Sequence, residues 1–341
     1  MTTTITNCDN DNKEEQAPNA IPFTHHIFDF DLHPSQPILA AGLINGQVHC
    51  YRYGLVSNTL QWSTQISKKS CRGVQFTKEG NRNISRDKSI QALDVSTGRI
   101  LYKLAKAHRY PINKLCQLDN QLTATGDDEG IIKIWDMRTC KAVQEYKRHQ
   151  DYISDMSFCD AKALGKLMSV ICRGDGILSI YDIRQPLTKI KVSQEIDDEL
   201  LSLTTVKDGQ AVIAGSQSGA LYIWNNAEWS SPPIKWIGHP NSVDALCALD
   251  QDTICSGSSD GLLRLITVSP NYKFEGILGD HEDEFPIERI VLTHDRAYMA
   301  SCGHDLSLRF WNVEFLFESQ KKRKCTEEPE SVKRARFFQD L

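Results

Sequence analysis

The chain has 341 residues, of which 40% are hydrophobic, and a formal net charge of −5 at pH 7. This size and hydrophobic content suffice for a large core, and the mild acidity does not favour a strongly basic nucleic-acid binder. The eleven cysteines include no Cys-x-x-Cys pair, which argues against a zinc site and indicates a reducing compartment, cytosol or nucleus. With no apolar run near the roughly 20 residues that span a bilayer, and no signal-peptide core, we expect a soluble, non-secreted protein.

The first segment, residues 1–20, is rich in Thr, Asn, Asp and Glu and carries almost no large apolar side chains. Such a composition cannot offset the entropy lost on ordering, so we expect this segment to be disordered. The last segment, residues 319–341, is basic, and we expect it to be disordered as well.

Between residues 21 and 318 one unit recurs: an apolar run, a strand of small residues, a polar turn, and an alternating strand. Six copies of the alternating strand end at Asp94, Asp136, Asp182, Asn225, Thr267 and Asn312, which are 42 to 46 residues apart. An earlier unit ends near residues 51–53, which makes seven units. A period of about 40–45 residues with several short strands is typical of β-propeller blades, because each blade needs neighbours to cover its two faces.

These units resemble WD repeats, and the last one matches best. His281, Ser301, Asp305 and Trp311 stand where that family has a hydrogen-bonded tetrad, a structural feature that satisfies buried polar groups. The third unit has His108, Thr125 and Trp135, with Glu129 in place of the turn Asp. The sixth unit keeps its His, Ser and Asp but has Ile266 in place of Trp.

The sequence therefore predicts an all-β, seven-bladed WD-repeat propeller over residues 21–318. The second unit is its weakest part, because residues 81–84 interrupt the place of an apolar strand and suggest that the second strand is degraded. The ring can close through residues 21–26 or through residues 313–317, and we favour the N-terminal segment.

No motif for catalysis, for a cofactor or for a metal is found, so we expect a protein that is not an enzyme. The acidic run at residues 280–284 is interpreted as a solvated loop at a blade entrance.

The C-terminal segment carries two basic clusters that resemble a bipartite nuclear localisation signal, read by a nuclear import receptor. The alternative is a solubilising tail or a non-specific nucleic-acid contact. The final Phe337-Phe338-Gln339-Asp340-Leu341 suggests a docking peptide or a segment that folds back. The residues of the two clusters are Lys321, Lys322, Arg323, Lys324, Lys333, Arg334 and Arg336.

Two consecutive units end in an Asp-x-Arg sequence, Asp136-Met137-Arg138 and Asp182-Ile183-Arg184. These resemble the boxes through which WD-repeat substrate receptors bind the adaptor of a cullin-RING ubiquitin ligase, where a planar guanidinium forms paired hydrogen bonds. The alternative is a local Asp–Arg pair that orders each turn.

In a propeller, the loops that enter the blades and the turns between second and third strands share one rim, here named the upper rim. We expect it to be acidic and suited to basic protein segments, and the lower rim to be mixed and more basic. The predicted upper-rim acids are Asp127, Asp128, Glu129, Asp151, Asp197, Asp198, Glu199, Asp280, Glu282, Asp283 and Glu284.

Three segments narrow the resemblance: residues 28–34, residues 85–89, and the tail with its terminal Phe-Phe-x-Asp-Leu. They look like the eukaryotic nucleolar WD-repeat family associated with ribosome biogenesis. The resemblance implies a nuclear or nucleolar scaffold for ribosomal RNA processing and large-subunit assembly. It implies basic ribosomal or assembly factors as partners and a monomer within larger complexes, and it leaves RNA contact open. The alternative function is the ligase substrate receptor.

Overall fold

The computed structural model describes residues 17–80, 82–86, 89–161, 165–172, 175–184, 190–225, 228–269, 271–281 and 285–317. Within these ranges the strands form seven antiparallel sheets of four strands each. The strands are β1 (Ile21–Pro22), β2 (Ile27–Leu32), β3 (Ile38–Leu43), β4 (Gln47–Arg52), β5 (Thr59–Gln65), β6 (Gly73–Phe76), β7 (Arg82–Arg86), β8 (Ile90–Asp94), β9 (Ile100–Leu104), β10 (Ile112–Gln117), β11 (Leu122–Asp127), β12 (Ile131–Asp136), β13 (Lys141–Lys147), β14 (Ile153–Ala161), β15 (Gly165–Cys172), β16 (Leu178–Asp182), β17 (Ile190–Val192), β18 (Leu200–Val206), β19 (Ala211–Ser216), β20 (Ala220–Trp224), β21 (Ile234–Ile237), β22 (Val243–Ala248), β23 (Thr253–Ser258), β24 (Leu262–Thr267), β25 (Lys273–Asp280), β26 (Ile287–Leu292), β27 (Tyr298–Gly303) and β28 (Ser307–Asn312).

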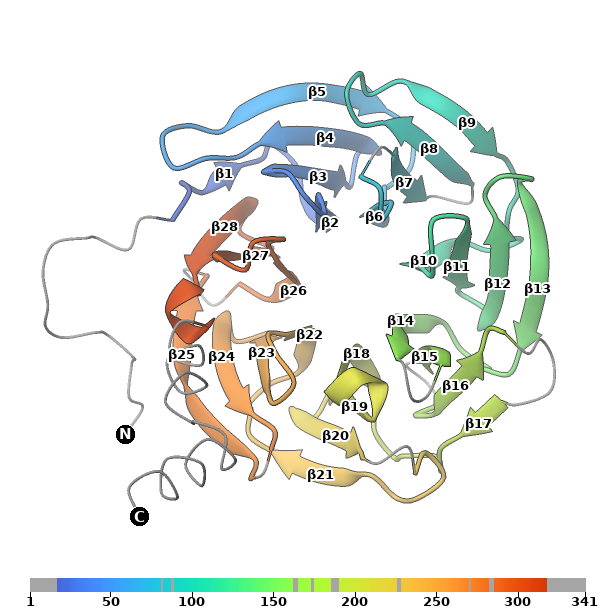
Figure 1. Cartoon of the computed structure of the whole chain (residues 1–341), viewed down its shortest axis with the longest axis vertical. Helices are drawn as coiled ribbons and strands as arrows, with labels where there is room; N and C mark the ends of the chain where they lie inside the picture. Colours follow the sequence, from blue (N-terminus) through green and yellow to red (C-terminus); the bar gives the residue numbers. More distant parts are fainter. Residues whose placement is uncertain are drawn as a thin grey trace, which may run out of the picture.

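The sheets stand as the blades of a closed ring (Figure 1). Blades 1 to 6 are β2–β5, β6–β9, β10–β13, β14–β17, β18–β21 and β22–β25, and blade 7 is β26–β28 with β1. The first strand of each blade lies innermost and contacts the first strands of both neighbouring blades, including β26 with β2.

The ring closes through the N-terminal segment. Ile21 and Pro22 of β1 pair with Leu308 and Ser307 of β28, so one sheet joins the two ends of the repeat region. The favoured closure is thereby confirmed, whereas residues 314–317 form a single helical turn instead of a closing strand.

The predicted architecture needs one correction of detail. The second blade does not lack its second strand, because β7 pairs with both β6 and β8. The all-β class is confirmed, and a short 3₁₀ helix, η1 (Lys207–Gly209), and the helical turn at 314–317 accompany the strands.

The burial pattern explains why these segments are strands. β3 (Ile38–Leu43) is buried at every position, as expected for a central strand covered on both faces, whereas the outer β5 (Thr59–Gln65) has mostly exposed residues. Small residues in the second strands let the next blade approach. A Cβ on Gly126 would lie 2.6 Å from Ile153 of blade 4, and one on Gly257 would lie 2.6 Å from Ile287 of blade 7.

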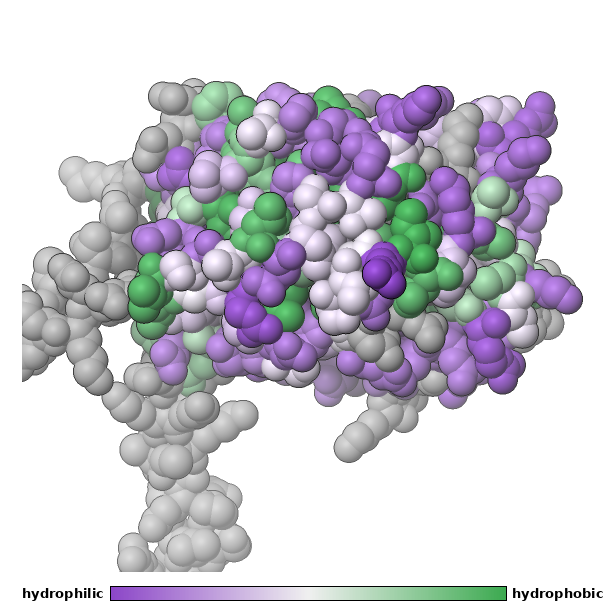
Figure 2. Space-filling view, turned by 90° about the horizontal axis from the view of Figure 1, so that it is seen from above, coloured by the Kyte–Doolittle hydropathy of each residue, from purple (hydrophilic) through white to green (hydrophobic). Residues whose placement is uncertain are grey.

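The outer wall over β5 and β9 is a mosaic, with small hydrophobic areas set among hydrophilic residues (Figure 2). Leu60, Ile100 and Leu101 of these strands are each about half exposed. Single exposed apolar residues of this kind are normal for a soluble surface.

Candidate interaction surfaces

The tetrad in blade 7 is present as one chain of hydrogen bonds. The Nδ1 atom of His281 lies 2.9 Å from Oδ2 of Asp305, and its Nε2 atom lies 2.7 Å from Oγ of Ser301. Trp311 donates its Nε1–H to the same Oγ atom at 2.7 Å. Because a carboxylate only accepts, Nδ1 of His281 carries a proton and donates it to Asp305.

Burial tends to raise the pKa of Asp305, but hydrogen bonds from His281 and Ser307 outweigh this and lower it to about 2. The buried carboxylate therefore remains charged at neutral pH and fixes the orientation of the histidine ring. This arrangement ties the loop entering blade 7 to its second and third strands.

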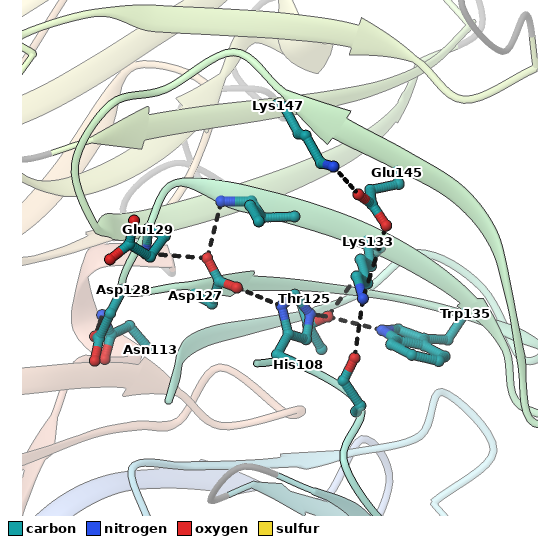
Figure 3. Close-up of polar contacts among 12 residues, drawn as sticks. His108, Asn113, Thr125, Asp127, Asp128, Glu129, Lys133, Trp135, Glu145 and Lys147 are labelled. Atoms are coloured by element: carbon teal, nitrogen blue, oxygen red, sulfur yellow. Dashed lines mark hydrogen bonds and ion pairs between the residues drawn. The ribbon is translucent and has the colours of Figure 1, made fainter. Parts of the chain in front are cut away.

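Blade 3 holds a second complete tetrad, which the sequence did not predict (Figure 3). His108 bonds to Oδ2 of Asp127 and to Oγ1 of Thr125, each at 2.7 Å, and Trp135 donates to Oγ1 of Thr125 at 2.8 Å. Glu129 does stand at the turn position that Asp305 occupies in blade 7, since each precedes a residue with positive φ. Asp127 supplies the carboxylate in its place, so the blade 3 network is complete and not partial as predicted.

The physical reason lies in strand alternation. Asp127 is two residues after Thr125 and therefore lies on the same face of β11, which lets it reach the histidine. Its other oxygen, Oδ1, accepts the backbone N–H groups of Glu129 at 3.1 Å and Ile131 at 2.9 Å. Asp127 is fully buried, so its place among the predicted surface acids is also wrong.

Blades 4 and 6 carry partial versions of the same network. His149 bonds to Asp175 at 2.8 Å, and His239 bonds to Ser256 at 2.8 Å. In blade 6, Asp260 pairs with Arg264 at 2.5 and 2.9 Å. Burial and the nearby Arg264 lower the pKa of His239 to about 4, so this ring is neutral at physiological pH.

The mouth of the central channel is built from the innermost strands at the upper rim. The register shifts by one residue near the start of β2, β10, β14, β18, β22 and β26, as in a β-bulge. The cavity there is lined by bulge residues such as Phe28 and Asn113 and by neighbouring charged groups. Sequence reasoning missed this site, although its residues recur at the blade period.

Ion pairs in the channel link different blades. Nζ of Lys114 in blade 3 lies 2.8 Å from Asp155 in blade 4, and Nε of Arg289 in blade 7 lies 3.3 Å from Asp29 in blade 1. Asp29 and Asp155 also accept backbone N–H groups of the next blade, from Val74 at 3.2 Å and Leu203 at 2.8 Å. These carboxylates therefore join blades to one another.

The two Asp-x-Arg sequences lie on the lower rim of blades 3 and 4. The Nη2 atom of Arg138 lies 3.4 Å from Asp136, and that of Arg184 lies 2.7 Å from Asp182. The arginine side chains are 71% and 52% exposed, so both guanidinium groups are accessible. The aspartates also accept the backbone N–H of Arg138 at 2.9 Å and of Arg184 at 3.0 Å, so each pair orders its own turn.

The predicted acidic residues of the upper rim do not lie together. A hollow between blades 4 and 5, here named the acidic hollow, is lined by Glu195, Asp197, Asp198 and Glu199 together with Ile196, Gln217 and Ser218. Asp128 and Glu129 lie at the β11–β12 turn of blade 3, where Asp128 faces Arg72 at 3.8 Å. Asp151 is partly buried before β14, and Asp280 is exposed at the end of β25.

The same rim carries basic residues that the sequence prediction left out. Lys68, Lys69 and Arg72 are exposed in the loop that enters blade 2, and Lys106 and Arg109 are exposed in the loop that enters blade 3. The upper rim is therefore not uniformly acidic over blades 2 and 3, in contrast to the prediction.

Several predicted site residues lie outside the described residues. They are Glu282, Asp283, Glu284, Lys321, Lys322, Arg323, Lys324, Lys333, Arg334 and Arg336. Among the residues that are described, no group of three or more His, Cys, Asp or Glu side chains is arranged to hold a metal. No helix in the described part of the chain has the length and apolarity needed to cross a membrane.

A comparison with models of protein families identifies the family of this propeller. Residues 18–316 match the model of the WDR55 family, which is nearly the whole repeat region. The chain belongs to the WDR55 family. The resemblance to a WD-repeat family that the sequence suggested is thereby confirmed.

Curated relatives named WD repeat-containing protein 55 are similar in sequence to this chain over most of their length. The chain is 37% identical over 310 residues to the WD repeat-containing protein 55 homolog of Dictyostelium discoideum, covering 90% of this chain and 73% of that protein. It is 38% identical over 298 residues to WD repeat-containing protein 55 of Arabidopsis thaliana, with coverage of 86% and 82%.

Solved structures of similar fold include the RRP9 WD40 repeats, with a TM-score of 0.75 and 12% identity. That match covers 86% of this chain and 97% of the RRP9 chain. U3-55K follows with a TM-score of 0.72, 12% identity, and coverage of 87% and 98%. At such low identity these matches show the WD40 propeller fold that this WDR55 member shares.

Proposed function

We propose that this WDR55-family protein is a non-catalytic interaction scaffold of the nucleus and nucleolus that supports ribosome biogenesis, in ribosomal RNA processing and large-subunit assembly. Family membership over nearly the whole propeller supports this role, together with the resemblance carried by residues 28–34 and 85–89. The nuclear address rests on the basic clusters of the C-terminal segment.

The observation that carries the proposal is the acidic hollow. Glu195 and Asp197 are exposed there, so their charges are available to a basic partner. Asp198 is held in place, since it accepts hydrogen bonds from the hydroxyl groups of Ser218 at 2.5 Å and Tyr222 at 3.1 Å. Ribosomal proteins and their assembly factors carry strongly basic segments, which an acidic surface attracts and orients.

An apolar residue stands beside these charges. Ile237 is 73% exposed and pairs across the sheet with Ala220, which follows the turn that lines the hollow. A basic segment with an apolar side chain therefore finds both kinds of contact at the edge of blade 5.

The test reverses two exposed charges of the hollow, Glu195→Lys with Asp197→Lys. Because each exposed pair contributes about 0.2–1 kcal/mol, capture of basic ribosomal proteins at mild salt should weaken roughly tenfold. In cells that depend on the variant, ribosomal RNA precursors should accumulate and the ratio of large to small subunits should fall.

The matched control is Glu228→Lys with Asp252→Lys, which makes the same charge change at exposed positions of the lower rim. It should leave both readouts unchanged. Normal precursor levels and subunit ratios after depletion of the protein would contradict the proposed function.

A second candidate function is adaptor binding in a cullin-RING ligase. The observation in its favour is the pair of exposed guanidinium groups, Arg138 and Arg184, at equivalent turns of neighbouring blades. Arg138→Asp with Arg184→Asp should abolish capture of the adaptor while leaving the melting temperature unchanged. Arg52→Asp with Arg99→Asp, on blades 1 and 2, is the control for lower-rim charge. Equal capture by the two double variants would remove this candidate.

A further inference from the structure

The charge of the exposed residues on the upper rim changes from acidic to basic around the ring. Opposite in charge to the acidic hollow is a group of cations in the loops that enter blades 2, 3 and 4, here named the basic sector. All its members are exposed: Lys68, Lys69, Arg72, Lys106, Arg109 and Arg148. They come from three successive loops of the ring, so the sector follows an arc over neighbouring blades (Figure 1).

The positive charge of the basic sector is mostly uncompensated. Within the described residues, no ion pair joins Lys68, Lys69, Lys106 or Arg109 to a carboxylate. The described acids of these loops and of the β11–β12 and β15–β16 turns are Asp127, Asp128, Glu129, Asp151 and Asp175. Asp127 and Asp175 are bonded to His108 and His149, so three acids remain at the surface beside six cations. A surface with this excess attracts a polyanion and gains affinity when the counterions of the polyanion are released.

Aromatic rings lie within the same arc. The guanidinium carbon of Arg109 stands 5.5 Å from the ring centre of Tyr110, a cation–π contact that orients the loop before β10. Tyr152, at the start of blade 4, is partly exposed and lines the channel mouth together with Arg72 and Asn113. Phe28 lines the same mouth and is 42% exposed.

The carboxylates at the mouth do not cancel this sector. Asp155 is paired with Lys114 at 2.8 Å, and Asp29 with Arg289 at 3.3 Å. The other two carboxylates that line the mouth are Asp244 of blade 6 and Glu288 of blade 7, outside the sector of blades 2 to 4. Asp244 accepts from the hydroxyl of Ser242 at 3.0 Å, and Glu288 lies 2.8 Å from Nε2 of His304.

We propose that the upper rim over blades 2 to 4 binds single-stranded RNA, with the phosphates along the basic sector and bases stacked on Tyr110 and Tyr152. A cationic arc that interleaves with aromatic rings is the combination that single-stranded nucleic acids require, because it meets both the backbone charge and the faces of the bases. This binding goes beyond the proposed scaffold function and uses a different part of the rim from the acidic hollow.

The experiment measures binding of a fluorescent single-stranded RNA of about 15 nucleotides to the full-length chain between about 50 and 200 mM salt. The basic clusters of the C-terminal segment could bind RNA on their own. All proteins compared therefore carry Gln at the seven basic positions of those clusters.

The sector variant is Lys68→Glu with Lys69→Glu and Arg109→Glu. If each cation meets one phosphate, its loss lowers the slope of log affinity against log salt by about 0.7, so three losses lower it by about 2. At about 0.1 M salt the affinity should fall on the order of 100-fold. The control Arg99→Glu with Lys103→Glu and Lys141→Glu makes the same charge change away from the upper rim and should cost far less.

Stacking is tested separately. Tyr152→Ala should weaken binding at least about fivefold, since stacking of one base contributes about 1–3 kcal/mol, and Tyr152→Phe should restore it. Thermal unfolding checks that each variant is folded.

Two results would overturn the inference: no saturable binding by the parent protein with Gln in the C-terminal clusters, or equal losses in the sector and control variants. The outcome of the RNA-binding experiment does not test the proposed scaffold function. That function is tested by the capture of basic proteins at the acidic hollow.

Discussion

The loss of stability on replacing Asp127 distinguishes a surface acid from a buried member of the blade 3 tetrad. From its place in an acidic run it is a surface residue, whose replacement changes stability by no more than about 0.5 kcal/mol. In the structure it is fully buried and accepts hydrogen bonds from His108 at 2.7 Å and from the backbone of Glu129 and Ile131.

Asp127→Ala removes the acceptor for all three donors and leaves Nδ1 of His108 buried without a partner. A buried donor without a partner costs about 1–3 kcal/mol, and the two turn amides add less because water can reach a rim. We therefore expect a loss of about 3–4 kcal/mol. Asp127→Asn keeps an acceptor for the turn and should lose about half as much.

The assay is unfolding by denaturant, followed by circular dichroism and by tryptophan fluorescence, with Glu129→Ala as the matched control. Glu129 is exposed and lies two residues after Asp127, so its replacement should move the midpoint very little. Amide exchange in β11 and β12 should rise in Asp127→Ala if the loss is local to blade 3. Equal midpoints for Asp127→Ala and Glu129→Ala would refute the tetrad as a source of stability.

Three further outcomes are expected. Burial raises the pKa of Asp31 from 3.8 to about 7, so its contribution to stability is complete below about pH 3.8 and is lost as the pH rises through 7. Asp31→Asn should accordingly gain about 2 kcal/mol more at about pH 8 than at about pH 5, and an equal effect at both pH values would contradict the assignment. Ile21→Ala in the closing strand should lower the free energy of unfolding by about 2–4 kcal/mol, because Ile21 is 2% exposed. Pro22→Ala, at the exposed neighbouring position, is the control and should lower it little. Equal melting temperatures for the two variants would argue against closure by β1. Replacement of either basic cluster, Lys321 to Lys324 or Lys333 to Arg336, by alanine should move a fluorescent fusion from the nucleus to the cytoplasm, and unchanged nuclear fluorescence would remove the localisation signal.

The sequence by itself determined the strands and the polar network of blade 7. The recurrence of small-residue and alternating strands depends only on local spacing, and so does the tetrad of His281, Ser301, Asp305 and Trp311, which the structure joins by hydrogen bonds. Strand patterns of this kind are readable because burial on one face or on both imposes them residue by residue.

What only the tertiary structure decided depends on which segments meet. The sequence pattern placed Glu129 at the turn position of blade 3 and left its tetrad without an Asp. In the structure Asp127 completes the tetrad, because it lies on the face of β11 that meets His108. Pairing of β1 with β28 joins residues nearly 290 apart, which no local pattern records. The distribution of charge around the upper rim could not be predicted from the order of charges along the chain. The ring brings the loops before β6 and β10 together as one basic arc, and the acids of residues 195–199 lie in another part of the rim.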